Sequence, residues 1–278
     1  MNAPALALLC GAGDFPYAVA DAAIANGRPP LMIGIAGSTD ARIEAYDHAW
    51  LHMGQIGRLF ALLKARDIAE MAIIGAMTRP EWSQLRLDWG ALRLAPRLAP
   101  LFRGGDNRLL IGIAGVFESA GVRILGAHEI APQLLMPLGP LGAIDADAGA
   151  LADAARAAQL VAALSDFDAG QGAIVAKGRV LAIEAAEGTD AMLARIAQMR
   201  AEQRLRFKGP AGVLVKAPKR DQDLRLDMPA IGLHTIAAAA HAQLQGLVLA
   251  AGKTLVVDRL ALAEAANAAG LFVIGQDL

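Results

Sequence analysis

The stretch ALALLCGAGDFPYAVADAAIANGRPPLMIGIA, residues 5–36, decides the fold of the first half of this 278-residue chain. An apolar run over residues 5–10 predicts a buried strand, and a glycine-containing loop leads from it into a helical pattern that ends at Gly27. Residues 31–36 form a second apolar run. A strand, a glycine loop, a helix and another strand in this order predict a doubly wound parallel α/β sheet.

The glycine loop is a candidate ligand site because it presents Gly13 and Asp14 at a strand end, where a helix start can bind phosphate. Gly11 and Gly13 match the first glycines of a dinucleotide fingerprint, but Pro16 stands where the third is expected. Asp40 comes several residues too late to close the second strand with an acid. A tight turn without a ligand explains the loop about as well, and we favour a ligand because open sheets bind at strand ends.

Another strand end in the first half carries polar candidates. A strand predicted over residues 71–75 runs into the loop GAMTRP, which contains Ala76, Thr78 and Arg79. Arg79 has the charge to bind a phosphate, although a solvated loop charge explains it better without further support.

A further helix and strand follow. The stretch GGDN, residues 104–107, opens a helical pattern, and a strand predicted over 122–126 ends at His128 and Glu129. These two side chains can bind metal or transfer protons at a strand end, and a simple capped turn is the alternative interpretation.

The composition excludes several classes of protein. The chain is 55% hydrophobic and 19% charged, which is enough apolar material for a core. A net charge of −1 argues against a protein that binds nucleic acid through bulk charge. Cys10 is the single cysteine, so no internal disulfide forms and a reducing compartment is expected. No secretory signal is expected at the N-terminus, and residues 228–252, although free of Asp, Glu, Lys and Arg, fit a helix and a buried strand better than a membrane span.

A segment rich in proline, glycine and leucine, residues 130–145, predicts a linker between two domains. We therefore place one domain at residues 1–129 and the other at 146–278. The second half mixes helical patterns with short strands, and Lys177-Gly178-Arg179 predicts the turn of a hairpin.

The stretch VLVKAPKRDQDLRLDMPAIGLHT, residues 213–235, carries the strongest chemical signal. It predicts a strand, a basic loop with Lys216, Lys219 and Arg220, and an extended run that ends at Asp227 before a helix. Cations attract phosphate, and a carboxylate binds a divalent metal or a water. The stretch therefore indicates phosphate chemistry, with metal assistance as one option.

Residues 81–108 show an unusual pattern of tryptophan and arginine. On a helix these residues would form an apolar face with Leu85, Trp89 and Leu92. A second, basic face would carry Arg86, Arg93 and Arg97. Such a segment suits a membrane surface or an acyl-chain groove. A helix packed on the sheet with an ordinary charged face is favoured by periodicity alone.

Two long motifs resemble a known family. The stretches GQGAIVAKGRVLAIEAAEGTDAML, residues 170–193, and VLVKAPKRDQDLRLDMPAIGLHTI, residues 213–236, are similar to signatures of the two-domain UDP-2,3-diacylglucosamine pyrophosphatases of lipid A biosynthesis. The shorter motifs GAGDFP, GAMTRP, GGDN and GAHE occur in the same order, so the resemblance covers nearly the whole chain. It implies an N-terminal Rossmann-like domain and a C-terminal mixed α/β domain, with the ligand cleft between them.

The resemblance also implies a reaction, in which water attacks the α-phosphorus of UDP-2,3-diacylglucosamine to give UMP and lipid X, assisted by Mg²⁺ or Mn²⁺. It implies that Asp227 binds metal or orients the water, that Lys216 and Lys219 neutralise the diphosphate, and that Asp190 is a second metal ligand. The remaining matched positions imply substrate contacts: Gly13, Asp14, Ala76, Thr78, Arg79, Gly104, Asp106, Glu129, Gln171, Gly172, Glu187, Gly188, Thr189, Gly232 and Thr235. The family pattern has Asn where Met77 stands, so a polar contact is lost there.

A diacylated substrate implies partners and a location. We expect a cytoplasmic enzyme that docks on the inner-membrane surface through residues 82–103, takes up a nucleotide-sugar lipid and binds no nucleic acid; a homodimer is compatible with these expectations. Two alternatives remain open, a nicotinamide-dependent oxidoreductase that uses the Gly11 loop and a non-catalytic nucleotide-sugar binding protein.

Overall fold

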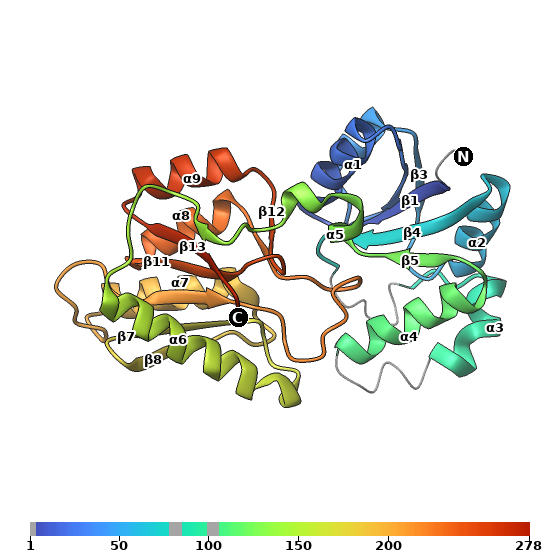
Figure 1. The fold of residues 1–278 in the computed structure, drawn as a ribbon. Coiled ribbons are helices and arrows are strands. Elements are labelled where there is room, and N and C mark those ends of the chain that lie inside the picture. The colour runs from blue at the N-terminus through green and yellow to red at the C-terminus, as the bar shows by residue number, and fades with distance from the viewer. Residues whose placement is uncertain (1–3, 78–84, 99–105) are drawn as a thin grey trace. The chain divides into compact units, whose positions relative to one another are not determined.

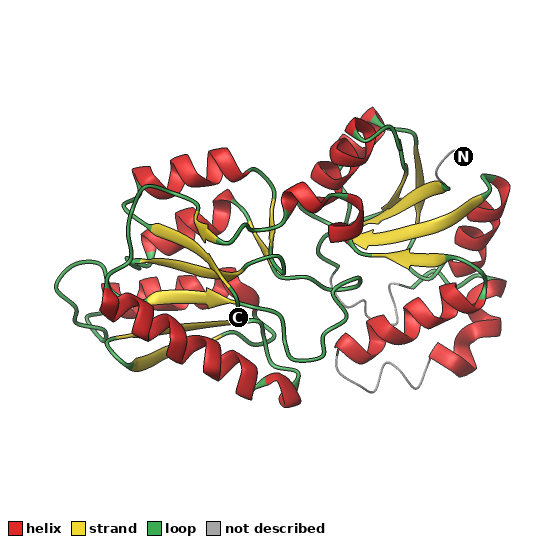
Figure 2. Cartoon of the chain, in the orientation of Figure 1, coloured by secondary structure: helices red, strands yellow, loops and turns green. Residues whose placement is uncertain are grey.

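The computed structural model describes residues 4–77, 85–98 and 106–278, which divide into two compact units (Figure 1). The first unit extends to Gln133 and also includes Arg225–Asp227. The second unit comprises Leu134–Leu224 and Met228–Leu278. Each unit contains both helices and strands (Figure 2), and the predicted two-domain α/β fold is confirmed.

The first unit contains a five-stranded parallel sheet in the order β3-β2-β1-β4-β5. Its strands are β1 (Ala5–Cys10), β2 (Leu31–Ile35), β3 (His48–Leu51), β4 (Ile68–Ile74) and β5 (Arg123–Leu125). The chain winds outward from β1 to β3 and then returns to β4 on the other side of β1, which is the doubly wound order. The predicted sheet is therefore confirmed, and the short β3 is a strand that the sequence pattern did not predict.

Helices cover both faces of this sheet. They are α1 (Phe15–Ala25), α2 (Ile56–Ala65), α3 (Trp89–Leu98), α4 (Asp106–Ser119) and α5 (Ala127–Ile130), with a 3-10 turn at Ala41–Ala45. Leu63 of α2 and Phe117 of α4 join Ile33 and Met71 of the strands in one apolar core. Helix α1 lies on the opposite face of the sheet (Figure 1).

The second unit contains a six-stranded mixed sheet in the order β6-β13-β11-β9-β7-β8. Its strands are β6 (Gly139–Pro140), β7 (Gly172–Ala176), β8 (Arg179–Ile183), β9 (Val213–Lys216), β11 (Gly246–Ala250) and β13 (Phe272–Gln276). Strands β9, β11 and β13 are parallel, whereas β7 and β8 form the predicted antiparallel hairpin. The short strands β10 (Ala230–Ile231) and β12 (Leu255–Val256) pair with each other in parallel, so β12 does not fold back on β11.

The residues of the second sheet alternate between two cores. On one face, helix α6 (Ala148–Ala163) packs Ala154 and Ala157 against Val175 and Val213. On the other face lie α7 (Gly188–Ala201), α8 (Leu233–His241) and α9 (Arg259–Ala268). Because helices cover both faces of the sheet, polar residues lie mainly in the loops at the strand ends, where a ligand site is expected.

The helical pattern predicted within residues 81–108 is confirmed only in part. Helix α3 begins only at Trp89 and contains Pro96, and Leu85 precedes it as non-helical chain. Residues 78–84, which include Trp82, and residues 99–105 lie outside the described part of the chain, as does the side chain of Arg97, so the predicted faces are described only for residues 85–96.

Candidate active site

In the second unit, the residues predicted from the two long motifs converge on one edge of the sheet. Lys216 is the last residue of β9 and pairs with Gly172, the first residue of the antiparallel β7. Strand β8 ends at the same edge, and the chain then enters α7 at Gly188. The structure therefore brings together Gln171, Gly172, Glu187, Gly188, Thr189 and Lys216 from three separate parts of the chain.

A buried ion pair lies at the centre of this edge. The Lys216 ammonium is 3.4 Å from the Glu184 carboxylate, and the two residues are only 6% and 7% exposed. Thr189 joins them, because its hydroxyl accepts from Lys216 and donates to Glu184 at 2.7 Å. A buried charge needs a counter-charge and hydrogen bonds, and this network supplies both to Lys216.

The second predicted lysine is also held in place. Lys219 forms an ion pair with Asp168, and its backbone N–H donates to the Gln222 side chain at 2.8 Å. The next residue, Arg220, donates its N–H to the Ser165 hydroxyl at 2.9 Å. These contacts fix the basic loop that follows β9 without using the Arg220 guanidinium.

Two helices begin at this edge without a capping side chain. The N-cap residues of α7 and α8, Glu187 and Gly232, make no side-chain cap hydrogen bond within the described structure. Asp190 in the first turn of α7 lies 3.5 Å from His234 in the first turn of α8, which places the two helix starts side by side. Uncapped first-turn N–H groups favour anions, so this edge suits a phosphate. Thr235, the last predicted contact here, is buried in the first turn of α8.

In the first unit, the loops after β1 and β4 are joined backbone to backbone. Ala12 and Ala76 exchange N–H···O hydrogen bonds of 2.8 and 3.0 Å. A Cβ at Gly11 would lie 2.4 Å from the Ala76 carbonyl oxygen, so only glycine permits this approach. Gly13 has a φ of +96° and open space around it. The predicted residues Gly13, Asp14 and Ala76 therefore share the carboxyl edge of this sheet.

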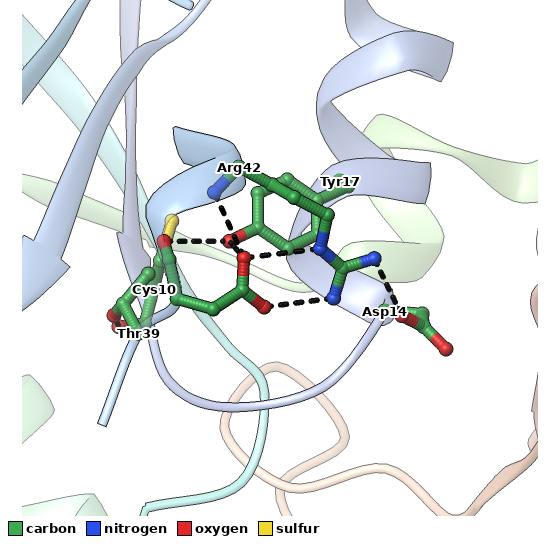
Figure 3. Close-up of polar contacts among 6 residues, drawn as sticks. Cys10, Asp14, Tyr17, Thr39 and Arg42 are labelled. Carbon is green, nitrogen blue, oxygen red and sulfur yellow. Dashed lines mark hydrogen bonds and ion pairs between the residues drawn. The ribbon is translucent and has the colours of Figure 1, made fainter. Parts of the chain in front are cut away.

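An ionic cluster borders the glycine loop (Figure 3). Arg42 donates to Asp40 at 2.8 and 3.0 Å and to Asp14 at 2.8 Å, and its guanidinium lies 4.4 Å from the centre of the Tyr17 ring. The hydrogen bonds from Arg42 hold the pKa of Asp40 well below its usual range. Because Arg42 and Tyr17 already donate to Asp40, this carboxylate is not poised to bind a ribose as the acid of a dinucleotide site does.

Cys10 lies beside this cluster in the described core, and its thiol donates to the Leu8 carbonyl. Burial raises the pKa of the thiol to about 12, and a hydrogen bond involving the Ile33 backbone only partly offsets this effect. A protonated, buried thiol is a packing group.

Glu129 has structural partners in the described chain. Its carboxylate accepts from the Gly126 N–H at 2.8 Å and pairs with Arg123 at 3.0 Å, so it fixes the start of α5. Thr78, Arg79 and Gly104 lie outside the described residues, as does the side chain of Asp106.

Asp227 belongs to the first unit although its motif begins in the second. The preceding Leu226 is 7% exposed and joins the core of the first unit, and Arg225 pairs with Glu118 of α4 at 2.8 Å. The two residues before Asp227 thus anchor it against the sheet that carries the glycine loop.

A preassembled metal cluster is absent from the described residues, none of which form a group of three or more His, Cys, Asp or Glu suited to a metal ion. The predicted ligands Asp190 and Asp227 belong to different units, and Asp190 contacts His234 within its own. One or two carboxylates together with substrate phosphates are nevertheless a common way to hold Mg²⁺.

Two α/β units with polar side chains and cations at their strand ends are typical of proteins that bind phosphorylated ligands. Residues 5–134 match the LpxI N-terminal domain and residues 137–274 match the LpxI C-terminal domain, so this chain belongs to the LpxI family. A protein of Caulobacter vibrioides named UDP-2,3-diacylglucosamine pyrophosphatase LpxI is 39% identical over 272 residues, which cover 98% of this chain and 97% of the relative. The resemblance found in the motifs is confirmed.

Two charged residues at these edges, Glu184 and Arg42, were not predicted from the sequence. Glu184 directly follows an apolar strand and precedes the loop of its motif, a position that could have marked it. The contact of Arg42 with the glycine loop lacked any such signal, because Asp14 is 28 residues away from Arg42. Thr189, a predicted substrate contact, lies in the first turn of α7 and donates its hydroxyl to Glu184.

The tyrosine environment gives a testable pH dependence. The chain has two tyrosines, and burial, reinforced by hydrogen bonds to Asp40 and Asp21, raises the pKa of Tyr17 and of Tyr46 to about 12. Tyrosinate absorbance of the folded protein should therefore rise near pH 12 instead of about pH 10, the value for a free tyrosine. Because both pKa values are raised on folding, the associated stability is complete below about pH 10 and is lost as the pH rises from there.

Matched variants separate the two rings. Asp40→Asn should lower the pKa of Tyr17 alone, and Asp21→Asn that of Tyr46 alone. A wild-type titration near pH 10, with circular dichroism still showing a folded protein, would contradict the described cluster.

Proposed function

We propose that this protein hydrolyses the pyrophosphate bond of UDP-2,3-diacylglucosamine to UMP and 2,3-diacylglucosamine 1-phosphate, known as lipid X. The observation that carries the proposal is the match to both LpxI domains, together with a 39% identical relative of that name aligned over nearly its whole length.

The bonds that form and break in this hydrolysis suggest a role for each site residue. A water oxygen bonds to the α-phosphorus, the bond from that phosphorus to the bridging oxygen breaks, and the bridging oxygen leaves with the sugar phosphate. Asp227 is the group we assign to bind the metal ion, with orientation of the attacking water as its alternative role. Lys216, Lys219 and the first turns of α7 and α8 would offset the negative charge of the diphosphate, since fixed dipoles and cations stabilise developing charge most.

One assay separates the three functions we considered. Incubation with UDP-2,3-diacylglucosamine and Mg²⁺ should release UMP, whereas an oxidoreductase would instead bind NADH and a binding protein would retain the intact substrate. Two observations disfavour a nicotinamide cofactor. Asp40 is already paired with Arg42, and Pro16 stands where the dinucleotide fingerprint has its third glycine.

Asp227→Asn should lower turnover by roughly 100-fold or more, because an uncharged amide is a weaker ligand for a divalent cation and a weaker acceptor for the attacking water. Binding of the substrate, measured by calorimetry at a temperature where the variant is folded, should remain. The exposed Asp221 provides the control, since Asp221→Asn changes the same charge six residues earlier and should leave turnover unchanged. Full activity of Asp227→Asn would remove this residue from the mechanism.

We propose Mg²⁺ or Mn²⁺ as the cofactor, with Asp227 and Asp190 as the carboxylates that would bind it. When bound, the ion would neutralise phosphate oxygens. Chelation with EDTA should abolish UMP release, and excess Mg²⁺ or Mn²⁺ should restore it. UMP release that continues undiminished in EDTA would refute the metal requirement.

Helix α3 supports membrane docking, since it is anchored on one side and apolar on the other. The Asp88 carboxylate accepts from the N–H groups of Gly57, Arg58 and Ala91 at 2.8–3.0 Å, which ties the starts of α2 and α3 together. Burial opposes ionisation of Asp88, but these N–H groups prevail and hold its pKa below the usual value. On the outer side Trp89 is 82% exposed and Leu92 is 48% exposed.

The helices in the described part of the chain are all too short or too polar to cross a bilayer. From the exposure of Trp89 and Leu92 beside Arg86 and Arg93, we propose peripheral docking on the cytoplasmic leaflet of the inner membrane, with the two apolar side chains entering the interface. The predicted homodimer stays a prediction.

Replacing Arg86, Arg93 and Arg97 together with Gln should weaken binding to vesicles of anionic phospholipid by roughly 100-fold at low salt, since each basic residue contributes ~1 kcal/mol at such a surface. Sedimentation of the protein with vesicles measures the change. The control replaces three other arginines, Arg156, Arg179 and Arg206, and should retain binding. Equal binding of wild type and the first variant would exclude α3 as the docking surface.

A further inference from the structure

Glu184 is the buried charge on which the edge of the second unit is assembled. One carboxylate oxygen faces the Lys216 ammonium at 3.4 Å and accepts from the Thr189 hydroxyl at 2.7 Å. The other accepts from the Gln171 N–H at 3.2 Å. Three segments that are distant in sequence therefore meet on a single side chain.

The backbone around Glu184 is fitted just as closely. Its N–H donates to Gly172 at 2.9 Å, and its carbonyl accepts from Gly170 at 3.0 Å. A Cβ at Gly170 would lie 2.5 Å from the Glu184 carbonyl oxygen, and one at Gly172 would lie 2.7 Å from its carboxylate. The two glycines that flank Gln171 in the motif are thus required by the position of Glu184.

We propose that Glu184 is a positioning residue of the active site, which acts directly and through the Thr189 hydroxyl to fix the Lys216 ammonium for the substrate's diphosphate. The inference rests on the proposed function for its substrate. Lys216 is buried, so water does not determine the position of its ammonium. Its described partners are Glu184 and Thr189. A cation fixed before the substrate arrives loses no free energy to reorganisation during the reaction.

The same unit contains a carboxylate suited as a control. Asp153 is 6% exposed, and its two oxygens accept from the N–H groups of Lys177 and Gly178 at 2.6 Å each. These groups form the turn between β7 and β8, at the end of the hairpin opposite Glu184. Asp153 therefore stabilises the same sheet without reaching the candidate site.

The test is a double-mutant cycle. Glu184→Gln keeps the size of the side chain and removes its charge, and Lys216→Met removes the ammonium. Each single change should lower kcat by roughly 100-fold, as expected for loss of a fixed electrostatic group. The double variant should be no more than about threefold slower than either, because the two residues act as one unit. Asp153→Asn should lower Tm but leave kcat within about twofold of wild type.

Other results would overturn the proposal. If Glu184→Gln lowers Tm as Asp153→Asn does but keeps kcat, Glu184 is merely structural. If the losses of Glu184→Gln and Lys216→Met multiply in the double variant, the two residues act independently. Should Glu184→Gln fail to fold, Thr189→Val replaces it in the cycle, because it removes the hydroxyl that joins Glu184 to Lys216.

Failure of the proposed function would be seen separately, as wild-type protein that releases no UMP. The free energy of UDP binding, measured by calorimetry for the same variants, then replaces kcat in the double-mutant cycle. The same lack of additivity supports positioning of Lys216 by Glu184, and additive losses reject it.

Discussion

A lysine that ends a buried strand cannot remain charged without a partner, and this constraint organises the second unit. Lys216 terminates β9 with only 6% of its surface exposed, so a carboxylate has to lie beside it. Glu184 supplies that charge from the end of β8, which is possible only because β8 and β9 end at the same edge. The intervening β7 then has to begin with small residues, and Gly170 and Gly172 meet this requirement.

The same constraint explains why the two family motifs combine glycines with an acid, a hydroxyl and a lysine at fixed positions. Each motif supplies part of the network, Glu184 and Thr189 from the first and Lys216 from the second. The apolar residues of β7 and β9 could be replaced by other apolar residues of similar size without loss of the sheet. The glycines, the acid, the hydroxyl and the amine could not, because each contacts another member of the network.

Much of the fold could be predicted from the sequence, because strands and helices leave local periodic patterns. The bounds of β1 and the hairpin of β7 and β8 followed from apolar runs and turn residues. Strand β3 was missed because HAWL is short and half-buried. Leu85 and Arg86 have helical spacing and were placed on helix faces, but Asp88 caps the helix, which begins only at Trp89. Pairing of β12 with β10 depends on contacts between distant segments, which local pattern does not report.

The candidate site was less predictable, since its geometry depends on partners that are distant in sequence. Residue types at strand ends indicated phosphate chemistry, but burial of Lys216 and its dependence on Glu184 required the structure. Asp227 shows the limit best. It lies eleven residues after Lys216, yet the burial of Leu226 and the ion pair of Arg225 assign it to the first unit. A motif that is continuous in sequence is therefore divided between two folded units, and the carboxylate and the ammonium we assign to one reaction are anchored in different cores. Each core can then fix its own group rigidly, since neither group depends on the packing of the other.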